Sequence, residues 1–401
     1  MESSTDVSPA LTQSTNRPLQ LWLLTAGGFF AFFIFGFVDN LKGPTFPNLL
    51  DELQFNYAQG GGILLGAYLG FVVATLLAGP LSDWAGNRTI LIIAGLLITG
   101  GILGFSHANT YPLLFASMLL MGMGTGSIEV GGNGLIVGLH PQAQGRYLNL
   151  LATFHGFGSL LVPLYAVWLL DAGISWRQVF QYSIPLVLVL VLLLLLTPAP
   201  RTAKMASSSG FDWATLRRTG FSTTMIGFYV AIALYVATEI GIAAWIVEYL
   251  IQTKGIAQAT AALYLSAFFG MIMIGRIVGS VLVDRIGYLR AIILAMIGAF
   301  VAILIAIVAP PALAFCLPLS GLFLSIIFPT MTAAVSRLHP HNTGTILGLL
   351  FTAAGLGGSL GPWSIGLASN AWGIGWGFAL TLLFCIGVIG TLALLIRQAR
   401  V

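Results

Sequence analysis

Long apolar runs, separated by short polar stretches, repeat along almost the whole chain. Twelve such runs can be counted, each about as long as the roughly 20 apolar residues that a membrane-spanning helix needs. They lie near residues 20–41, 59–81, 89–106, 111–138, 145–170, 179–197, 221–250, 257–283, 289–308, 311–337, 342–369 and 374–397. The pattern predicts an all-α membrane protein with twelve transmembrane helices.

The composition supports a membrane protein. The chain is 58% hydrophobic and only 7% charged, whereas soluble domains carry about 25% charged residues. Its 49 glycines fit helices in lipid, where small residues let neighbouring helices approach closely. With so few charges, the net charge of +4 indicates basic loops on one side of a bilayer, and we expect no nucleic-acid partner.

The longest polar stretch in the interior divides the runs into two sets of six. It reads TPAPRTAKMASSSGFDWATLRRTG and is rich in Pro, Ser and basic residues. We therefore predict an N-terminal tail at 1–19, an N-terminal six-helix bundle at 20–197, a linker at 198–220 and a C-terminal six-helix bundle at 221–401. With the N-terminus in the cytoplasm, twelve Lys and Arg residues lie inside and three outside. The excess predicts a cell-membrane protein with both termini, and the linker, in the cytoplasm.

An internal repeat relates the two sets of helices. GPLSDWAGNR follows the second run and GSVLVDRIGYLR follows the eighth, and both read L-x-D-x-x-G followed by an arginine. Their aspartates, Asp83 and Asp284, lie 201 positions apart, and the acidic residues Asp39 and Glu239 lie 200 apart. Matches at nearly one spacing indicate a duplicated six-helix unit, and so two pseudo-symmetric bundles.

The repeated loop resembles the signature of the major facilitator superfamily. Further segments resemble, more narrowly, the fucose–galactose–glucose proton symporter family: FGFVDNLKGPTFP in the first run, GMGTGSIEVGGN in the fourth, RYLNLLATFHGFGS in the fifth and LSIIFPTMTAA in the tenth. The matches extend over nearly the whole chain. The resemblance implies the major facilitator fold and a secondary transporter.

The same resemblance implies roles for individual residues. In that family an aspartate of the first helix and a glutamate of the fourth are the proton- and sugar-coupled acids, and they fall on Asp39 and Glu129. The asparagine of the fourth helix falls on Asn133. The glutamine and asparagine of the fifth helix fall on Ala152 and His155, which departs from the family pattern. The coupling acids of the family therefore have direct counterparts in this sequence, whereas its sugar ligands of the fifth helix do not.

Three acidic residues lie within predicted spans: Asp39, Glu129 and Glu239. A charge there costs roughly 2.5–3.5 kcal/mol on insertion scales. Desolvation favours the neutral form of a carboxyl group, so such a group can load a proton on one side and release it on the other. We predict these three as the proton-coupling residues. A protonated Glu129 bonded to a neighbouring helix, or an Asp39 that contacts Lys42 in the outer loop, are the structural alternatives.

Further polar positions are predicted to bind substrate. Glu129 and Asn133 are four residues apart and share one helix face, where they can hold vicinal hydroxyls. The predicted substrate-binding residues are Glu129, Asn133, Asn149, His155 and Tyr235. The predicted gating residues, which brace helix ends and loops, are Asp83, Arg88, Arg276, Asp284 and Arg285; for Arg276, a direct functional role is the alternative. Pro329 and Pro362 are predicted to break the tenth and eleventh helices.

These features favour proton-coupled symport of a small polyhydroxylated solute, a monosaccharide, by alternating access. The alternatives are proton-driven efflux of a lipophilic or cationic compound or a lipid, and a sensor that binds solute without moving it. The sequence contains no phosphate-binding loop, nucleophile motif or metal-ligand cluster, so we expect no enzyme activity, no cofactor and no metal. The expected partners are a small-molecule solute, a proton or in its place sodium, and the lipid bilayer. We expect a monomer.

Overall fold

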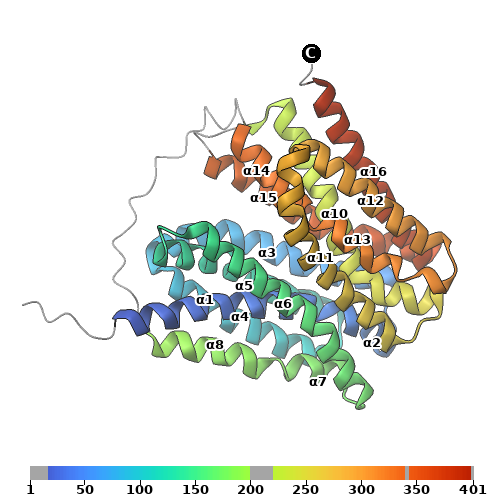
Figure 1. Ribbon diagram of the computed structural model, residues 1–401. Helices are drawn as coiled ribbons and strands as arrows, with labels where there is room; N and C mark the ends of the chain where they lie inside the picture. Colours follow the sequence, from blue (N-terminus) through green and yellow to red (C-terminus); the bar gives the residue numbers. More distant parts are fainter. Residues whose placement is uncertain (1–16, 199–219, 339–342, 399–401) are drawn as a thin grey trace, which may run out of the picture.

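The structure of the protein is a computed structural model that describes residues 17–198, 220–338 and 343–398 (Figure 1). The predicted tail at 1–19 and linker at 198–220 therefore lie almost wholly outside the described residues. Within the described residues, every regular element is a helix. The first set comprises α1 (Arg17–Asn40), α2 (Lys42–Leu53), α3 (Tyr57–Ala85), α4 (Asn87–His107), α5 (Tyr111–Leu139), α6 (Gln144–Asp171), α7 (Trp176–Gln181) and α8 (Ile184–Leu196).

The second set follows the undescribed segment. It comprises α10 (Thr223–Lys254), α11 (Gln258–Ile286), α12 (Tyr288–Val308), the short 3₁₀ helix η2 (Pro311–Leu313), α13 (Cys316–Leu324), α14 (Ile327–Leu338), α15 (Thr343–Trp372) and α16 (Ile374–Gln398). The described residues contain 12 helical stretches long and apolar enough to cross a membrane. The predicted number of spans is therefore confirmed.

Three of the spans are interrupted helices. The first joins α1 to α2, the sixth joins α7 to α8, and the tenth joins η2, α13 and α14. The tenth span breaks just before Pro329, as predicted. The break predicted at Pro362 is wrong, because α15 continues through that residue. Proline is tolerated within membrane helices, and Trp245 Nε1 of α10 donates to Pro362 O at 2.9 Å, which ties α10 to α15 at this position.

The first span is longer than the sequence pattern indicated. It covers Leu19–Leu53, with a break at Leu41. Pro44 lies in the first turn of α2, where a helix needs no backbone N–H donor, so the helix resumes at once. Lys42 is consequently only 5% exposed, and its expected place in an outer loop is wrong.

The two halves repeat each other in detail. α3 and α11 both have 29 residues, α4 and α12 both have 21, and each pair begins 201 positions apart. The residue between the two helices is Gly86 in one half, at φ 83° and ψ 148°, and Gly287 in the other, at φ 88° and ψ 145°. That backbone region is open almost only to glycine. The pseudo-symmetric six-helix units are therefore confirmed.

Glycines allow close packing inside each half. A Cβ atom at Gly122 of α5 would overlap the backbone of Ala67 in α3, and one at Gly357 of α15 would overlap that of Ala233 in α10. Helix axes can approach this closely only where no side chain intervenes.

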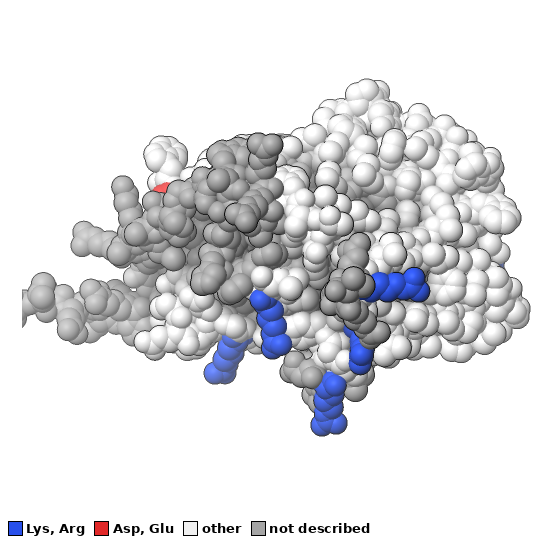
Figure 2. All heavy atoms as spheres, turned by 90° about the horizontal axis from the view of Figure 1, so that it is seen from above, with Lys and Arg blue, Asp and Glu red and all other residues white. Residues whose placement is uncertain are grey.

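The two halves meet at one end of the molecule, which we call the closed end. There Tyr57 Oη donates to Glu248 Oε1 at 2.9 Å, and Gln258 Nε2 donates to Pro44 O at 3.0 Å and Asn48 Oδ1 at 2.5 Å. Towards the other end, the open end, the two bundles diverge (Figure 1). The face seen in Figure 2 is mostly uncharged, and its Lys and Arg side chains stand near the grey segments.

Candidate functional site

A cavity of about 1250 Å³ lies between the two halves. Its wall is built by α1, α3, α5 and α6 from the first half and by α10, α11, α14 and α15 from the second, with a residue of α12. It reaches Asn149, Tyr288 and Gly348, which lie at or near the first residues of α6, α12 and α15 and therefore towards the open end. The cavity is thus shared by the two halves and faces the side on which they diverge.

All residues predicted for proton coupling and substrate binding line this cavity. They are Asp39, Glu129, Asn133, Asn149, His155, Tyr235 and Glu239. Their side chains come from α1, α5 and α6 on one wall and from α10 on the other. The structure therefore brings the predicted set together, while the roles assigned to the individual residues stay predictions.

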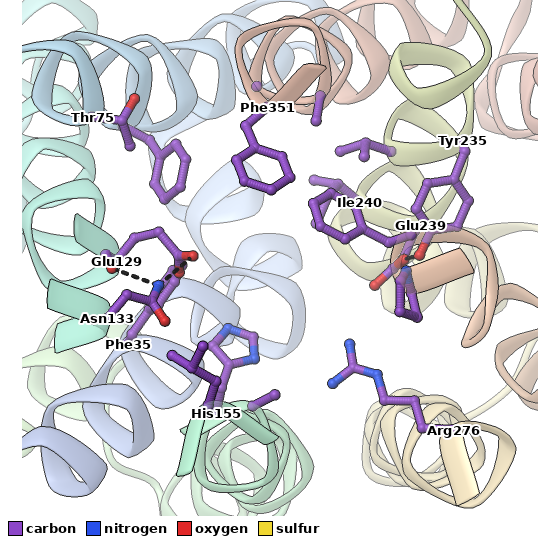
Figure 3. A pocket seen from close by; sticks show the side chains of 18 of the residues that line it. Phe35, Thr75, Glu129, Asn133, His155, Tyr235, Glu239, Ile240, Arg276 and Phe351 are labelled. Atoms are coloured by element: carbon purple, nitrogen blue, oxygen red, sulfur yellow. Dashed lines mark hydrogen bonds between the residues drawn. The ribbon is translucent and has the colours of Figure 1, made fainter. Parts of the chain in front are cut away.

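Glu129 and Asn133 form one unit on α5. Asn133 Nδ2 donates to Glu129 Oε1 at 3.0 Å and to the Glu129 backbone oxygen at 2.8 Å. No Lys, Arg or His side chain of the described residues lies within 4.0 Å of the Glu129 carboxyl group. The unit thus presents carboxyl and amide oxygens to the cavity without a cation beside it (Figure 3).

Asp39 is held differently. Its Oδ1 lies 2.6 Å from Lys42 Nζ, and both side chains are well buried. Tyr68 Oη of α3 donates to Asp39 Oδ2 at 3.2 Å, and the Lys42 ammonium stands 4.7 Å from the centre of the Tyr68 ring. The break between α1 and α2 makes this possible, because it lets the first residue of α2 reach back to the last turn of α1. Asp39 is therefore both a cavity residue and half of an ion pair.

The second half contributes a separate cluster. Tyr235 Oη donates a hydrogen bond to Glu239 Oε2, one turn further along α10. Arg276 of α11, predicted to be a gating residue, also lines the cavity, and its charge acts on Glu239.

His155 faces this cluster from the first half. Its ring packs edge-on against Phe35, with the ring centres 4.6 Å apart. Figure 3 shows the imidazole of His155 and the guanidinium of Arg276 pointing towards each other across the cavity. The charge of Arg276 also acts on His155. Two nitrogen-bearing side chains from opposite halves therefore approach the same part of the cavity.

Three other predicted gating residues, Asp83, Arg88 and Arg285, do not line the cavity. Arg88 donates from Nε to Leu194 O at 2.8 Å and from Nη2 to Leu195 O at 3.2 Å, which ties the start of α4 to the end of α8. Asp83 and Arg285 are exposed, and within the described residues no ion pair joins Asp83 to Arg88. The side chain of Asp284 lies outside the described residues. The gating role of all five predicted residues stays a prediction.

Sequence reasoning missed some residues of the site. Tyr68 bonds Asp39 from another helix, and Lys42 was assigned to a loop. Aromatic side chains also form much of the wall, among them Phe71, Phe328 and Phe351. In the sequence, Tyr68 and these phenylalanines look like any other aromatic position of a membrane helix, so no signal marked them.

Among the described residues, no group of three His, Cys, Asp or Glu side chains could hold a metal ion.

Comparison with protein families gives one clear match. Residues 28–362 and 282–400 match the family model of the Major Facilitator Superfamily. The chain is 24% identical over 375 residues to a glucose/galactose transporter of Brucella abortus, an alignment that covers 88% of this chain and 89% of that protein.

Solved structures share the fold. A bacterial homologue of the human lysosomal transporter Spinster, in an inward-facing and occupied conformation, superimposes with a TM-score of 0.77 at 14% identity, covering 96% of this chain and 98% of that one. A single-residue variant of the E. coli fucose:proton symporter FucP superimposes with a TM-score of 0.62 at 22% identity, covering 92% and 98%. At such identities the likeness shows the fold alone.

Proposed function

The chain belongs to the Major Facilitator Superfamily, and we propose that it is a secondary transporter that carries a monosaccharide together with a proton. It is a multi-pass membrane transporter and not an enzyme. The glucose/galactose transporter of Brucella abortus and the FucP symporter, which resemble it at low identity, support a sugar as the solute and a proton as the coupled ion.

The observation that carries this proposal is the environment of Glu129. Of the three acids that line the cavity, Asp39 is paired with Lys42, and Glu239 lies in the field of Arg276. Glu129 has Asn133 as its polar neighbour and no cation within 4.0 Å among the described residues. An uncompensated carboxylate is costly in a dry site, so binding a proton or a polar solute there relieves the cost.

The transport cycle follows from the shared cavity. We assign the open end to the cytoplasm of the cell, in agreement with the excess of basic loop residues, so this conformation releases solute inward. To load from outside, the halves rock about the cavity, and the contacts between Tyr57 and Glu248 at the closed end separate. A proton that accompanies the solute inward is driven by about 2.3 kcal/mol per 100 mV of membrane potential.

The test is solute-induced proton movement. The protein is reconstituted in liposomes with a weak buffer outside, and glucose, galactose, pentoses and deoxysugars are added in turn. We expect an outside pH rise with one or a few of them. The rise should disappear in Glu129→Gln, which keeps the shape of the side chain but cannot bind and release a proton.

Asp171→Asn is the matched control, because Asp171 is an exposed carboxylate at the end of α6, outside the cavity. It should give the wild-type pH rise. An unchanged response in Glu129→Gln would remove Glu129 from the coupling. The absence of a response to every sugar would reject sugar symport.

The aromatic wall of the cavity favours a second candidate function. Phe328 and Phe351 stack with ring centres 5.6 Å apart, and Phe35 and Phe71 stack at 5.9 Å. Such a wall suits a lipophilic compound or a lipid, exported in exchange for protons. Movement of a lipophilic cation against an imposed proton gradient, with no response to sugars, would favour this function instead.

A further inference from the structure

Arg276 is an unusual residue in this cavity. Among the described residues that line it, Arg276 is the one Lys or Arg side chain. Its guanidinium makes no hydrogen bond and no ion pair within 4.0 Å with any described side chain. A lone cation at membrane depth is costly and usually has a partner, so the missing partner requires an explanation.

Glu239 does not supply that partner. It is near enough for the charges to interact, but its carboxylate accepts the hydrogen bond of Tyr235 and is not in contact with Arg276. The other ionisable side chain in the field of Arg276 from the first half is His155. Within the described residues, neither ring nitrogen of His155 is hydrogen-bonded.

The geometry therefore offers free donors from both halves. A guanidinium has five N–H donors in a planar fork that matches a carboxylate, and it holds such a group more firmly than an ammonium does. The His155 ring points towards the same space from the opposite wall (Figure 3). An anionic group placed between them would contact both halves at once.

We propose that Arg276 and His155 bind a carboxylate of the solute, so that the transported monosaccharide is a sugar acid of the hexuronate type. This rests on the proposed function, proton-coupled monosaccharide transport, and specifies its substrate class. One unpaired cation matches the single charge of a carboxylate. A phosphate group carries about −1.5 to −2 charges at neutral pH and would need more cations.

The charge of the solute changes the energetics of transport. A neutral sugar that moves with one proton carries one positive charge across the membrane, so the membrane potential drives it. A uronate that moves with one proton carries no net charge. Its uptake should respond to a pH gradient and be insensitive to the potential.

The experiment compares sugars that differ only at C6. Proteoliposomes receive radiolabelled D-glucuronate or D-glucose, and D-galacturonate or D-galactose, with either a pH gradient alone or a potassium diffusion potential at equal pH. We expect at least one uronate to accumulate with the pH gradient and not with the potential. Its neutral counterpart should be taken up at least about tenfold more slowly, because it lacks the charged contact.

Variants test the assignment of the carboxylate site. Arg276→Gln should raise the KM for the uronate at least about tenfold, whereas Arg276→Lys, which keeps the charge but not the fork, should lie between that variant and the wild type. Arg290→Gln is the matched control, since Arg290 is an exposed arginine near the start of α12. It should behave as the wild type.

The outcomes separate the two proposals. If neutral hexoses are taken up with the potential and uronates are not transported, the sugar-acid assignment is wrong while proton-coupled sugar transport stands. If neither kind of sugar moves, both proposals fail. Uronate uptake with an unchanged KM in Arg276→Gln would show that Arg276 only balances Glu239. If Arg276→Gln does not fold, the Lys variant and the wild-type potential dependence decide.

Discussion

At the scale of single residues, the pair of Asp39 and Lys42 should be a strong determinant of stability. Their charged atoms are 2.6 Å apart, with side chains 14% and 6% exposed respectively. Removing one partner of a buried pair leaves the other charge uncompensated, which typically costs 3–5 kcal/mol. We expect Asp39→Asn to lower the free energy of unfolding by about that amount, measured by thermal unfolding in detergent.

The double variant Asp39→Asn with Lys42→Met is the control, because it removes both charges together. It should recover most of the lost stability. A recovered fold without proton coupling would then assign a transport role to Asp39, separately from its structural one. An equal loss of stability in the single and double variants would contradict the importance of the ion pair.

His140 provides a pH-dependent contribution outside the spans. Its ring stacks on Tyr147 and its Nε2 lies 2.8 Å from Thr25 Oγ1. Burial lowers the pKa of the His140 imidazole from its ordinary value of 6.5. Because the folded pKa lies below the unfolded one, the neutral ring stabilises the fold above about pH 6.5, and this contribution declines as the pH falls through the folded pKa.

An NMR titration of ¹³C-labelled histidine, with His140→Gln to identify the signal, would measure this shift. We expect the His140 signal to titrate below pH 6.5. A midpoint at or above that value would show that the ring is more hydrated than its packing indicates.

At the scale of elements, the turns between α3 and α4 and between α11 and α12 should depend equally on glycine. Gly86 and Gly287 share a positive φ with an extended ψ, a backbone conformation in which a side chain costs about 1–3 kcal/mol. A Cβ atom would meet nothing within 4 Å at either position, so the cost is purely conformational. Gly86→Ala and Gly287→Ala should therefore lower the unfolding temperature to a similar degree.

Gly79→Ala separates backbone strain from the general effect of adding a methyl group. Gly79 lies in α3, its φ is not positive, and a Cβ atom there also meets nothing within 4 Å. Alanine is the better helix former, so this variant should be neutral or stabilising by up to about 1 kcal/mol. A loss of stability at Gly79 as large as at Gly86 would refute the conformational explanation.

At the scale of the whole molecule, the contact of Tyr57 with Glu248 should bias the transporter towards the conformation described here. The bond joins α3 to α10 across the closed end, and Glu248 is only 4% exposed. A hydrogen bond contributes about 0.5–1.5 kcal/mol. Tyr57→Phe should therefore increase the population of the state open at the other side by about two- to tenfold.

Spin labels can measure that shift. Thr110 and Ala312 are exposed, lie at the closed end and belong to different halves, so cysteines there, in a background without Cys316 and Cys385, report the separation of the two halves. The control is Tyr229→Phe, because the buried Tyr229 hydroxyl has no hydrogen-bond partner among the described residues. Equal distance distributions in both variants would show that the hydrogen bond between Tyr57 and Glu248 does not stabilise the closed end.

The sequence by itself determined the class of the protein, its twelve spans and its duplication. These features depend on local physics: a membrane requires long apolar helices, and a copied unit keeps its turn glycines and acidic positions at a fixed spacing. It also identified several of the polar residues that line the cavity, because an acidic or amide side chain within an apolar helix has few other reasons to be there.

Only the tertiary structure decided which of these residues are neighbours. The separation of 29 residues between Asp39 and Tyr68 gives no hint of their hydrogen bond, and 121 positions separate His155 from Arg276. The break at Leu41 decided that Lys42 is buried against Asp39, which leaves Glu129 as the acid without a cation. Packing between distant helices sets these charge balances, so a hydrophobicity pattern, which records each helix separately, cannot contain them.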